Sequence, residues 1–170
     1  MEHNYPPNTL DIEASGFGSS SYPIEVGIAK HNGERYCALI CPQSDWLHWS
    51  DTAEQLHGIS RKALLERGKP ACEVCLELNK FLNKDAVFSD ALSHDQRWLQ
   101  RLFESVSFSP SFQLRAIEHI MLEQQFKYWD RAKAELEISL NTERHRASSD
   151  ALLIQQAYVL SHRAASKDAA

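Results

Sequence analysis

The alternation of apolar and polar positions along the chain predicts an ordered mixture of strands and helices. Runs with a period of two residues predict strands, and apolar positions three and four apart predict helices. The predicted strands are 9–13, 22–30, 34–41, 85–89 and 111–114, and the predicted helices are 70–83, 92–104, 115–138 with a break near Gln124-Gln125, and 148–163. Asn32-Gly33 predicts a hairpin turn between the second and third strands, because these residues tolerate positive φ. This order indicates an α/β sandwich around a mixed sheet.

Length and composition are those of one globular domain. The chain has 170 residues, of which 43% are apolar and 24% charged, which is an ordinary globular mixture. We expect a single domain over residues 1–163 and a short, flexible, Ala-rich tail over residues 164–170.

The charge balance limits the partners and the location. Lys and Arg number 18 and Asp and Glu 23, for a net charge of −5, so any contact with nucleic acid must be local and not a bulk attraction. No apolar run approaches the ~20 residues that span a bilayer, and the first residues lack the pattern of a signal peptide. We therefore expect a cytoplasmic protein without a membrane segment, whose cysteines are reduced.

The four cysteines fall in two pairs, Cys37 with Cys41 and Cys72 with Cys75. Two such pairs could ligate zinc in a tetrahedral site. The first pair lies in a predicted strand and the second in a predicted helix, whereas zinc pairs usually lie on tight turns. The sequence favours buried, reduced core cysteines, which pack as small hydrophobes.

Four carboxylates interrupt the apolar pattern. Asp11 and Glu13 lie two apart in the first strand, so both point to one face of a strand that is usually central in an α/β sheet. Asp95 precedes Trp98, Leu99 and Leu102 at offsets of 3, 4 and 7. Asp150 precedes Leu153, Ile154 and Ala157 at the same offsets. Each helical Asp therefore begins the core-facing stripe of its helix.

These carboxylates have two interpretations. Each alone is explained by an exposed strand edge or by a first-turn Asp that favours the helix dipole, an effect of about 0.3–1 kcal/mol. Together they indicate a shared cation, because carboxylate oxygens suit Mg²⁺ or Mn²⁺. Two divalent metal ions would balance four negative charges, and sites that hold two such ions promote in-line phosphoryl displacement.

His145 lies five residues before Asp150. If the last helix begins near Ser148, a good N-cap residue, His145 lies on the preceding loop. A histidine there could act as a general base toward water, because its usual pKa is near neutral. A solvent-exposed loop histidine is the alternative.

These residues carry a resemblance to the DEDDh, or DnaQ-like, family of 3′→5′ exonucleases. The segment Asp11-Ile12-Glu13-Ala14 is similar to the family motif Asp-x-Glu-Thr, and His145-Arg146-Ala147-Ser148-Ser149-Asp150 matches His-x-Ala-x-x-Asp. Leu56-His57-Gly58-Ile59-Ser60 resembles the His-Gly-Ile turn that precedes a helix. In the second motif, His-Asn-x-x-Phe-Asp, only Asp95 is retained, followed by Leu99.

The resemblance extends over residues 9–163 and implies a ribonuclease H-like fold with a five-stranded mixed β-sheet flanked by α-helices. It implies two Mg²⁺ or Mn²⁺ ions held by Asp11, Glu13, Asp95 and Asp150, with His145 as the general base. It also implies a homodimer. Ala14 replaces the family's threonine and removes a hydroxyl near the substrate, and the altered second motif changes the surroundings of Asp95.

Single-stranded substrates need stacking surfaces and local positive charge. By resemblance, the Gly16-Phe17-Gly18 loop approaches the terminal nucleotide, and Phe17 is the first stacking candidate. Further candidates for substrate contact are Ala14, His57, Trp46, His48 and Trp49. Candidates for positive charge are Arg97, Arg101, Lys127, Arg131, Arg144 and Arg146, of which the two that flank His145 are favoured.

The leading hypothesis is a metal-dependent 3′→5′ exonuclease that releases nucleoside 5′-monophosphates from single-stranded DNA, RNA or short oligonucleotides. The alternative is a nucleic-acid- or partner-binding module with a degenerate nuclease site, which the altered second motif motivates. A nuclease for double-stranded ends, or a proofreading part of a polymerase, is a third possibility.

Overall fold

A five-stranded mixed sheet forms the centre of the computed structural model, which describes residues 6–140 and 145–168. The strands are β1 (Thr9–Ala14), β2 (Pro23–Ala29), β3 (Arg35–Leu39), β4 (Ala86–Ser89) and β5 (Gln113–Ala116), in the order β3-β2-β1-β4-β5. The first three strands pair antiparallel, whereas β4 is parallel to both β1 and β5. The predicted fold class, α/β with a mixed five-stranded sheet flanked by helices, is confirmed.

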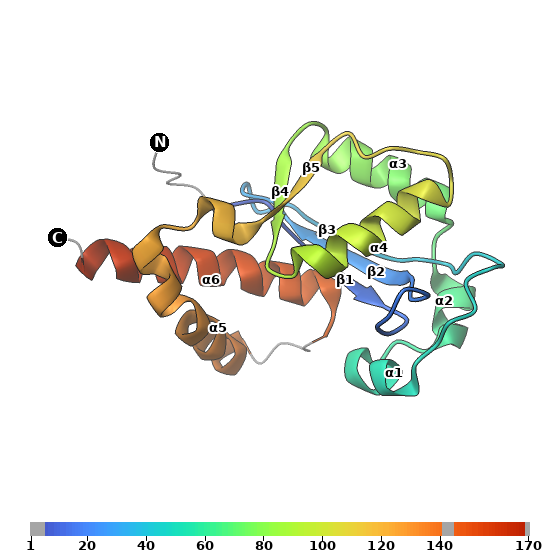
Figure 1. Ribbon diagram of the computed structural model, residues 1–170, viewed down its shortest axis with the longest axis horizontal. Helices are drawn as coiled ribbons and strands as arrows, with labels where there is room; N and C mark the ends of the chain where they lie inside the picture. Colours follow the sequence, from blue (N-terminus) through green and yellow to red (C-terminus); the bar gives the residue numbers. More distant parts are fainter. Residues whose placement is uncertain (1–5, 141–144, 169–170) are drawn as a thin grey trace.

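Helices cover both faces of this sheet. They are α1 (Asp51–His57), α2 (Arg61–Arg67), α3 (Ala71–Leu82), α4 (Leu92–Glu104), α5 (Phe126–Leu140) and α6 (Ala147–Asp168). Helix α6 crosses one face with α5 beside it, and α3 and α4 lie on the other (Figure 1). Helices α1 and α2 stand near the C-terminal end of β1, where the backbone N–H of Ser50 donates to Ser15 O over 2.9 Å.

The two faces of β1 differ in chemistry. Leu10 and Ile12 are buried in the main hydrophobic cluster together with Trp98 and Leu102 of α4. Asp11 and Glu13 alternate with them and therefore face the opposite side, toward α6. Thr9 Oγ1 also faces α6 and donates to Ala151 O over 2.6 Å. The central strand thus presents its acids to the helix that carries Asp150.

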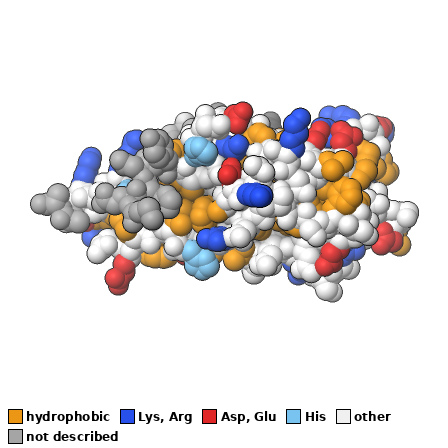
Figure 2. Space-filling view, turned by 90° about the horizontal axis from the view of Figure 1, so that it is seen from above, with side chains coloured by type: hydrophobic (Ala, Val, Ile, Leu, Met, Phe, Trp, Pro, Cys, Tyr) orange, Lys and Arg blue, Asp and Glu red, His pale blue; other side chains and the backbone are white. Residues whose placement is uncertain are grey.

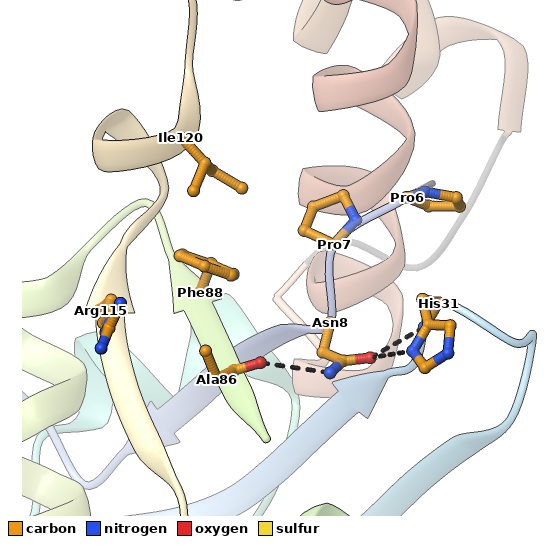
Figure 3. Close-up of a pocket in the computed structure, with 8 residues that line it drawn as sticks. All are labelled: Pro6, Pro7, Asn8, His31, Ala86, Phe88, Arg115 and Ile120. Carbon is orange, nitrogen blue, oxygen red and sulfur yellow. Dashed lines mark hydrogen bonds between the residues drawn. The ribbon is translucent and has the colours of Figure 1, made fainter. Parts of the chain in front are cut away.

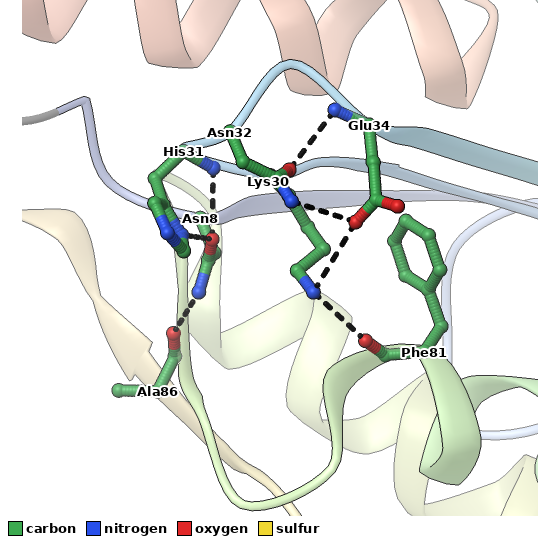
Figure 4. A network of polar contacts seen from close by, with 7 residues as sticks. All are labelled: Asn8, Lys30, His31, Asn32, Glu34, Phe81 and Ala86. Atoms are coloured by element: carbon green, nitrogen blue, oxygen red, sulfur yellow. Dashed lines mark hydrogen bonds and ion pairs between the residues drawn. The ribbon is translucent and has the colours of Figure 1, made fainter.

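A polar network fixes the other end of the sheet (Figure 4). Asn8 Oδ1 accepts the backbone N–H of His31 over 2.9 Å, and Asn8 Nδ2 donates to Ala86 O over 3.1 Å. Lys30 Nζ donates to Phe81 O over 3.2 Å. The two Asn8 bonds join the start of β1 to the β2–β3 hairpin and to β4, and the Lys30 bond joins the hairpin to α3.

Several predicted boundaries were wrong between residues 111 and 125. The fifth strand begins at Gln113 and ends at Ala116, because parallel pairing with β4 places Ala86 opposite Gln113 and Ser89 opposite Ala116. The α-helix predicted from Arg115 begins only at Phe126, and two short 3-10 turns, Ile117–Ile120 and Glu123–Gln125, precede it. The predicted break near Gln124-Gln125 is therefore where the helix starts.

Two other regions depart from expectation. Helix α1 was not predicted; its signal is Ser50, whose side chain accepts the N–H of Ala53 as an N-cap. Helix α6 begins at Ala147, so Ser148 lies within its first turn and is not its N-cap. The same helix continues to Asp168, so residues 164–168 are helical where a flexible tail was expected.

The cysteines are all free thiols and lie within the described residues. Cys75 is buried in the core as predicted, but Cys37 and Cys72 are exposed and Cys41 is partly exposed. The prediction of four core cysteines was wrong because Cys37 lies on the edge strand β3 and Cys72 on the outer side of α3. No helix in the described ranges is long and apolar enough to cross a bilayer.

Candidate active site

Asp11 and Glu13 lie on the central strand, on the face toward α6. Glu13 is opposite Glu25 of β2 in the antiparallel ladder, and the register shifts between Glu13 and Ala14. This irregularity occurs where β1 leaves the sheet, next to the loop that carries Phe17. Both carboxylates are partly buried. Their position agrees with the expectation of a central strand with shielded acids and not an exposed edge.

Asp95 comes from the first turn of α4 and is 1% exposed. Its Oδ2 accepts a hydrogen bond from Ser89 Oγ at the end of β4. Ser89 Oγ also accepts the backbone N–H of Ala91 over 2.9 Å. Ser89 therefore joins the end of β4 to the first turn of α4 and holds Asp95 in place, within the altered second motif.

His145, just before α6, and Asp150, in the first turn of α6, lie close to Glu13. Single ligand atoms of Glu13, His145 and Asp150 all lie within 4.8 Å of one another. The backbone N–H of His145 donates to Asp150 Oδ2 over 3.1 Å, and His145 has a φ of 60°. The predicted position of His145 ahead of the helix, close to the acids, is what the structure has.

The pKa values show that these carboxylates form one electrostatic group. Burial, then the charges of Asp95, Glu13 and Asp150, raise the pKa of Asp11 well above its usual range. Burial, then Asp150 and Glu25, raise the pKa of Glu13 to about 8. Burial raises that of Asp95 to about 7, although the Ser89 hydrogen bond acts in the opposite direction. Ionised acids this close repel one another unless cations lie between them.

The donor set fits hard divalent cations. Asp11, Glu13, Asp95 and Asp150 supply carboxylate oxygens, which Mg²⁺ and Mn²⁺ prefer. Glu13, His145 and Asp150 form the one group of three or more potential metal ligands found in the described parts of the chain. Burial and mutual repulsion raise the pKa of Asp11 and of Glu13, and a bound cation would offset both causes.

A small pocket of about 120 Å³ adjoins these acids and is lined by Glu13, Ala14, Phe17, His57 and Trp98, among others. His57 is 5% exposed, and its Nδ1 accepts the backbone N–H of Ile59 over 3.0 Å. Burial lowers the pKa of His57, so the ring is neutral and its proton is on Nε2. Among the described residues, Nε2 has no hydrogen-bond partner. One residue that lines the pocket therefore carries a buried N–H group without a hydrogen-bond partner in the described part of the chain.

Aromatic side chains extend from this pocket. Phe17 is 71% exposed and packs edge-on against His94, with ring centroids 5.7 Å apart. His94 stacks on Trp98 at 5.6 Å. Gly16 at the base of the loop has a φ of 141°, and a Cβ there would lie 2.8 Å from His48 and Ser50. The loop can thus approach α1 only because residue 16 is glycine.

Three residues predicted to contact substrate have partners within the protein. Trp46 is 2% exposed and stacks on Tyr22 at 5.1 Å, so its indole packs in the core and does not flank a substrate end. Trp49 Nε1 donates to Glu54 Oε2 over 2.7 Å. His48 Nδ1 and Ser15 Oγ are hydrogen-bonded at 3.0 Å.

The arginines also have protein partners. Arg146 forms an ion pair with Glu25 at 2.6 Å. Arg101 Nη1 donates to Ser21 O over 3.2 Å, and Arg97 lies 5.6 Å above the Trp98 ring. Lys127 and Arg131 lie on the exposed side of α5, as expected of a solvated helix face. Arg144 lies outside the described residues.

Three charged residues near the site were missed by the sequence analysis. Asp90 follows β4, contributes to the raised pKa values of Asp11 and Asp95, and pairs with Lys133 of α5 at 2.6 Å. The three residues are thus Asp90, Lys133 and Glu25. Glu25 could have been found from the sequence, because it is the one acid in the apolar segment 22–29.

Other surface features are unlike this site. A cavity of about 390 Å³ lies at the N-terminal ends of β1 and β4, lined mainly by apolar groups such as Pro7, Phe88 and Ile120 (Figure 3). Its His31 ring already bonds Asn8 at 2.9 Å. On the face shown in Figure 2, acidic and basic side chains are interspersed and do not form one basic surface.

Comparison with known proteins supports the fold class. No family model matches the chain, and no curated protein sequence does. Solved structures do match, and they show that the fold is the ribonuclease H-like fold of exonuclease I. The resemblance seen in the sequence is thereby supported at the level of the fold.

Among the matching structures are several of exonuclease I, and the first two described here are from E. coli. The complex with a dA16 oligonucleotide has a TM-score of 0.67 and 11% identity, covering 92% of this chain and 40% of the other. The zinc-bound form of the complex with single-stranded DNA gives the same four values. A complex with SSB and the inhibitor CFAM has a TM-score of 0.63 and 13% identity, covering 91% and 40%. This chain thus spans about 40% of the length of those proteins.

Proposed function

We propose that the protein is a metal-dependent 3′→5′ exonuclease that releases nucleoside 5′-monophosphates from single-stranded DNA, RNA or short oligonucleotides. The observation that carries this proposal is that ligand atoms of Glu13, His145 and Asp150 lie within 4.8 Å of one another on a ribonuclease H-like sheet. Asp11 and Asp95 interact electrostatically with these acids. The single-stranded oligonucleotides bound to exonuclease I agree with it.

Asp11, Glu13, Asp95 and Asp150 would hold two Mg²⁺ or Mn²⁺ ions. When bound, the ions would supply positive charge that stabilises the transition state of phosphodiester hydrolysis. Burial of the acids strengthens this effect, because charges interact more strongly where water is excluded.

His145 would act as the general base. Its ligand atom lies within 4.8 Å of those of Glu13 and Asp150, so it can accept a proton from a water molecule at the acids. The 3′-oxygen of the penultimate nucleotide is the leaving group, and the product carries a 5′-phosphate.

The pocket beside Glu13 would receive the terminal nucleotide. The His57 Nε2–H group would donate to the sugar or the base, while Phe17 would stack on a base at the rim. Gly16 and Ala14 shape the pocket without offering side-chain donors. A cytoplasmic location and a homodimer remain predictions from the sequence.

A cleavage assay tests the proposal. Single-stranded DNA and RNA oligonucleotides labelled at the 5′ end would be incubated with pure protein in Mg²⁺, Mn²⁺ or EDTA. We expect a ladder of shortened products that requires metal and disappears with Asp11→Asn. Asp130→Asn, which changes an exposed acid of α5, is the matched control and should cleave normally.

Two outcomes would contradict the proposal. Undiminished cleavage by folded Asp11→Asn would show that the acids are not the active site. Binding of both oligonucleotides without cleavage in any metal would favour the alternative, a binding module with a disabled nuclease site, which the altered second motif around Ser89 and Asp95 motivates.

A further inference from the structure

Glu25 is a buried carboxylate that the proposed mechanism does not use. It lies on β2 opposite Glu13, and its side chain is 1% exposed. Two nitrogen atoms of Arg146 donate to it: Nη2 to Oε1 over 2.6 Å and Nε to Oε2 over 3.1 Å. The backbone N–H of Ala147 donates to Oε2 over 2.9 Å. One carboxylate thus binds both residues that follow His145.

Two further residues of the sheet fix the same segment. A Cβ on Gly27 would lie 2.1 Å from the Ala147 carbonyl carbon and 2.2 Å from the Ser148 nitrogen. The first turn of α6 therefore rests directly on β2, at a position where only glycine fits. From the edge strand β3, Arg35 Nη2 donates to Ser148 O.

These contacts act on residues next to the reacting groups. His145 immediately precedes Arg146, and its backbone N–H bonds to Asp150 Oδ2 over 3.1 Å. His145 has a φ of 60°, an uncommon conformation for a residue with a side chain, which surrounding contacts must hold. Sub-ångström placement of a general base matters because proton transfer needs hydrogen-bond distance.

We propose that Glu25 and Arg146, together with Gly27 and Arg35, form a clamp that positions His145 and Asp150 for the reaction. The inference rests on the proposed function and deepens it. In this clamp Arg146 is a positioning residue, whose guanidinium is committed to Glu25, and it is not a contact for substrate phosphate.

A simple structural ion pair is the competing explanation. A buried pair often adds little net stability compared with apolar residues, but removing one partner leaves an uncompensated charge. Stability alone therefore does not separate the two explanations. The effect on kcat relative to KM does, because a clamp changes the geometry of the base and leaves substrate binding in place.

The test uses the isosteric variant Glu25→Gln, the variant Arg146→Gln, which removes the guanidinium, and the double variant. Single-stranded oligonucleotide cleavage would be measured at saturating Mg²⁺. We expect kcat to fall roughly 10–100-fold in each single variant, the range typical for partners that orient site residues, with KM changed less than about twofold. The double variant should lose about as much as either single variant, because both changes remove one interaction. Glu66→Gln, which removes the exposed pair with Lys62, should match the wild type.

Three results would overturn the proposal. An unchanged kcat in folded Glu25→Gln and Arg146→Gln would show that the pair does not position the base. A raised KM with a weaker salt dependence in Arg146→Gln, and normal kcat, would show that Arg146 binds phosphate. Additive losses in the double variant would show two separate roles. Arg146→Lys, which keeps the charge but loses the planar fork, serves if a Gln variant does not fold; a clamp predicts a reduced kcat there.

Hydrogen exchange separates this inference from the proposed function. In the wild type, the Ala147 N–H is bonded to Glu25 and should exchange slowly, and Glu25→Gln should increase its rate more than it does for amides in the middle of α6. Equal protection in both proteins would refute the clamp even in an active enzyme. If the wild type cleaves no oligonucleotide, the proposed function fails, and this measurement still decides whether the clamp exists.

Discussion

Glu13 and Glu25 lie opposite each other in the β1–β2 ladder, yet their surroundings differ. Glu25 accepts hydrogen bonds from Arg146 and from the backbone of Ala147. Glu13 faces Asp150, Glu25 and Asp95, which together with burial raise its pKa to about 8. Glu25 thus has hydrogen-bond donors, whereas the surroundings of Glu13 favour a proton or an added cation, as expected of the metal ligand proposed above.

The raised pKa of Glu13 predicts how stability changes with pH in the absence of metal. Its folded pKa of about 8 exceeds its ordinary value of 4.5, so between these values the folded state binds a proton that the unfolded state does not. The contribution to stability is full below about pH 4.5 and is lost as the pH rises through 8. Asp95, with a pKa of about 7, acts in the same direction. In EDTA, the Tm of the wild type should fall between pH 5 and 8.

Glu13→Gln removes this dependence in part. Its Tm should exceed that of the wild type at pH 8 and approach it at pH 5, when both are measured by thermal unfolding in EDTA. Mg²⁺ should raise the Tm of the wild type at pH 8 more than that of the variant, because binding stabilises the folded state. Parallel pH profiles for the two proteins would show that Glu13 is ionised normally.

His145 should distinguish zinc from magnesium. Its ligand atom lies within 4.8 Å of those of Glu13 and Asp150, and zinc accepts imidazole nitrogen readily, whereas magnesium prefers oxygen. His145→Ala should weaken Zn²⁺ binding at least about tenfold and change Mn²⁺ binding far less, as measured by calorimetry. Zinc should also inhibit Mg²⁺-supported cleavage, since a histidine that binds metal cannot accept a proton.

The exposed His119→Ala serves as the control for the zinc experiment and should bind both metals normally. Equal weakening of Zn²⁺ and Mn²⁺ binding by His145→Ala would mean that the imidazole supports the whole site. No effect on either metal would mean that His145 does not act as a metal ligand.

Variants of His57 test whether this residue contacts the substrate, because its two ring nitrogens have separate roles. Nδ1 accepts the Ile59 N–H, whereas Nε2 has no partner among the described residues. His57→Asn can retain the first role and His57→Gln the second. If Nε2–H contacts substrate, Asn should raise KM more than Gln does, by a factor of about 3–10, the effect of one hydrogen bond. Thermal unfolding should show the opposite order, with Gln less stable, and equal KM values would remove His57 from the substrate contacts.

The parts of the fold predicted from sequence are those set by nearby residues. The period of two in 9–13 and the Asn32-Gly33 turn place β1 and the β2–β3 hairpin correctly, within two residues. The fifth strand was misplaced because its bounds depend on parallel pairing with β4, some 27 residues away in the chain. Its sequence, Gln-Leu-Arg-Ala, has no strong strand preference of its own.

In the candidate site, too, local patterns could be read from the sequence, whereas contacts between distant residues could not. Asp11, Glu13, Asp95 and Asp150 could be predicted because each interrupts a regular apolar period. Trp46 could not be placed, because an aromatic residue in a loop can pack in the core or against a ligand, and its stacking on Tyr22 depends on the tertiary structure. Arg146 shows the same limit, since its partner Glu25 is 121 residues away.

Phe17 provides the sharpest test of the substrate surface. Its ring is 71% exposed, on a loop directly after β1, and it extends the His94–Trp98 stack outward. A base stacked on an aromatic ring contributes about 1–3 kcal/mol, so Phe17→Ala should raise KM for oligonucleotides roughly 5–150-fold. The Tm should change little, because the ring is mostly outside the core. Phe17→Leu keeps an apolar side chain without the π-face and should give an intermediate KM. Phe126→Ala, which truncates another exposed ring at the start of α5, should leave KM unchanged. Equal KM values for Phe17→Ala and the wild type would place the path of the strand elsewhere on the surface.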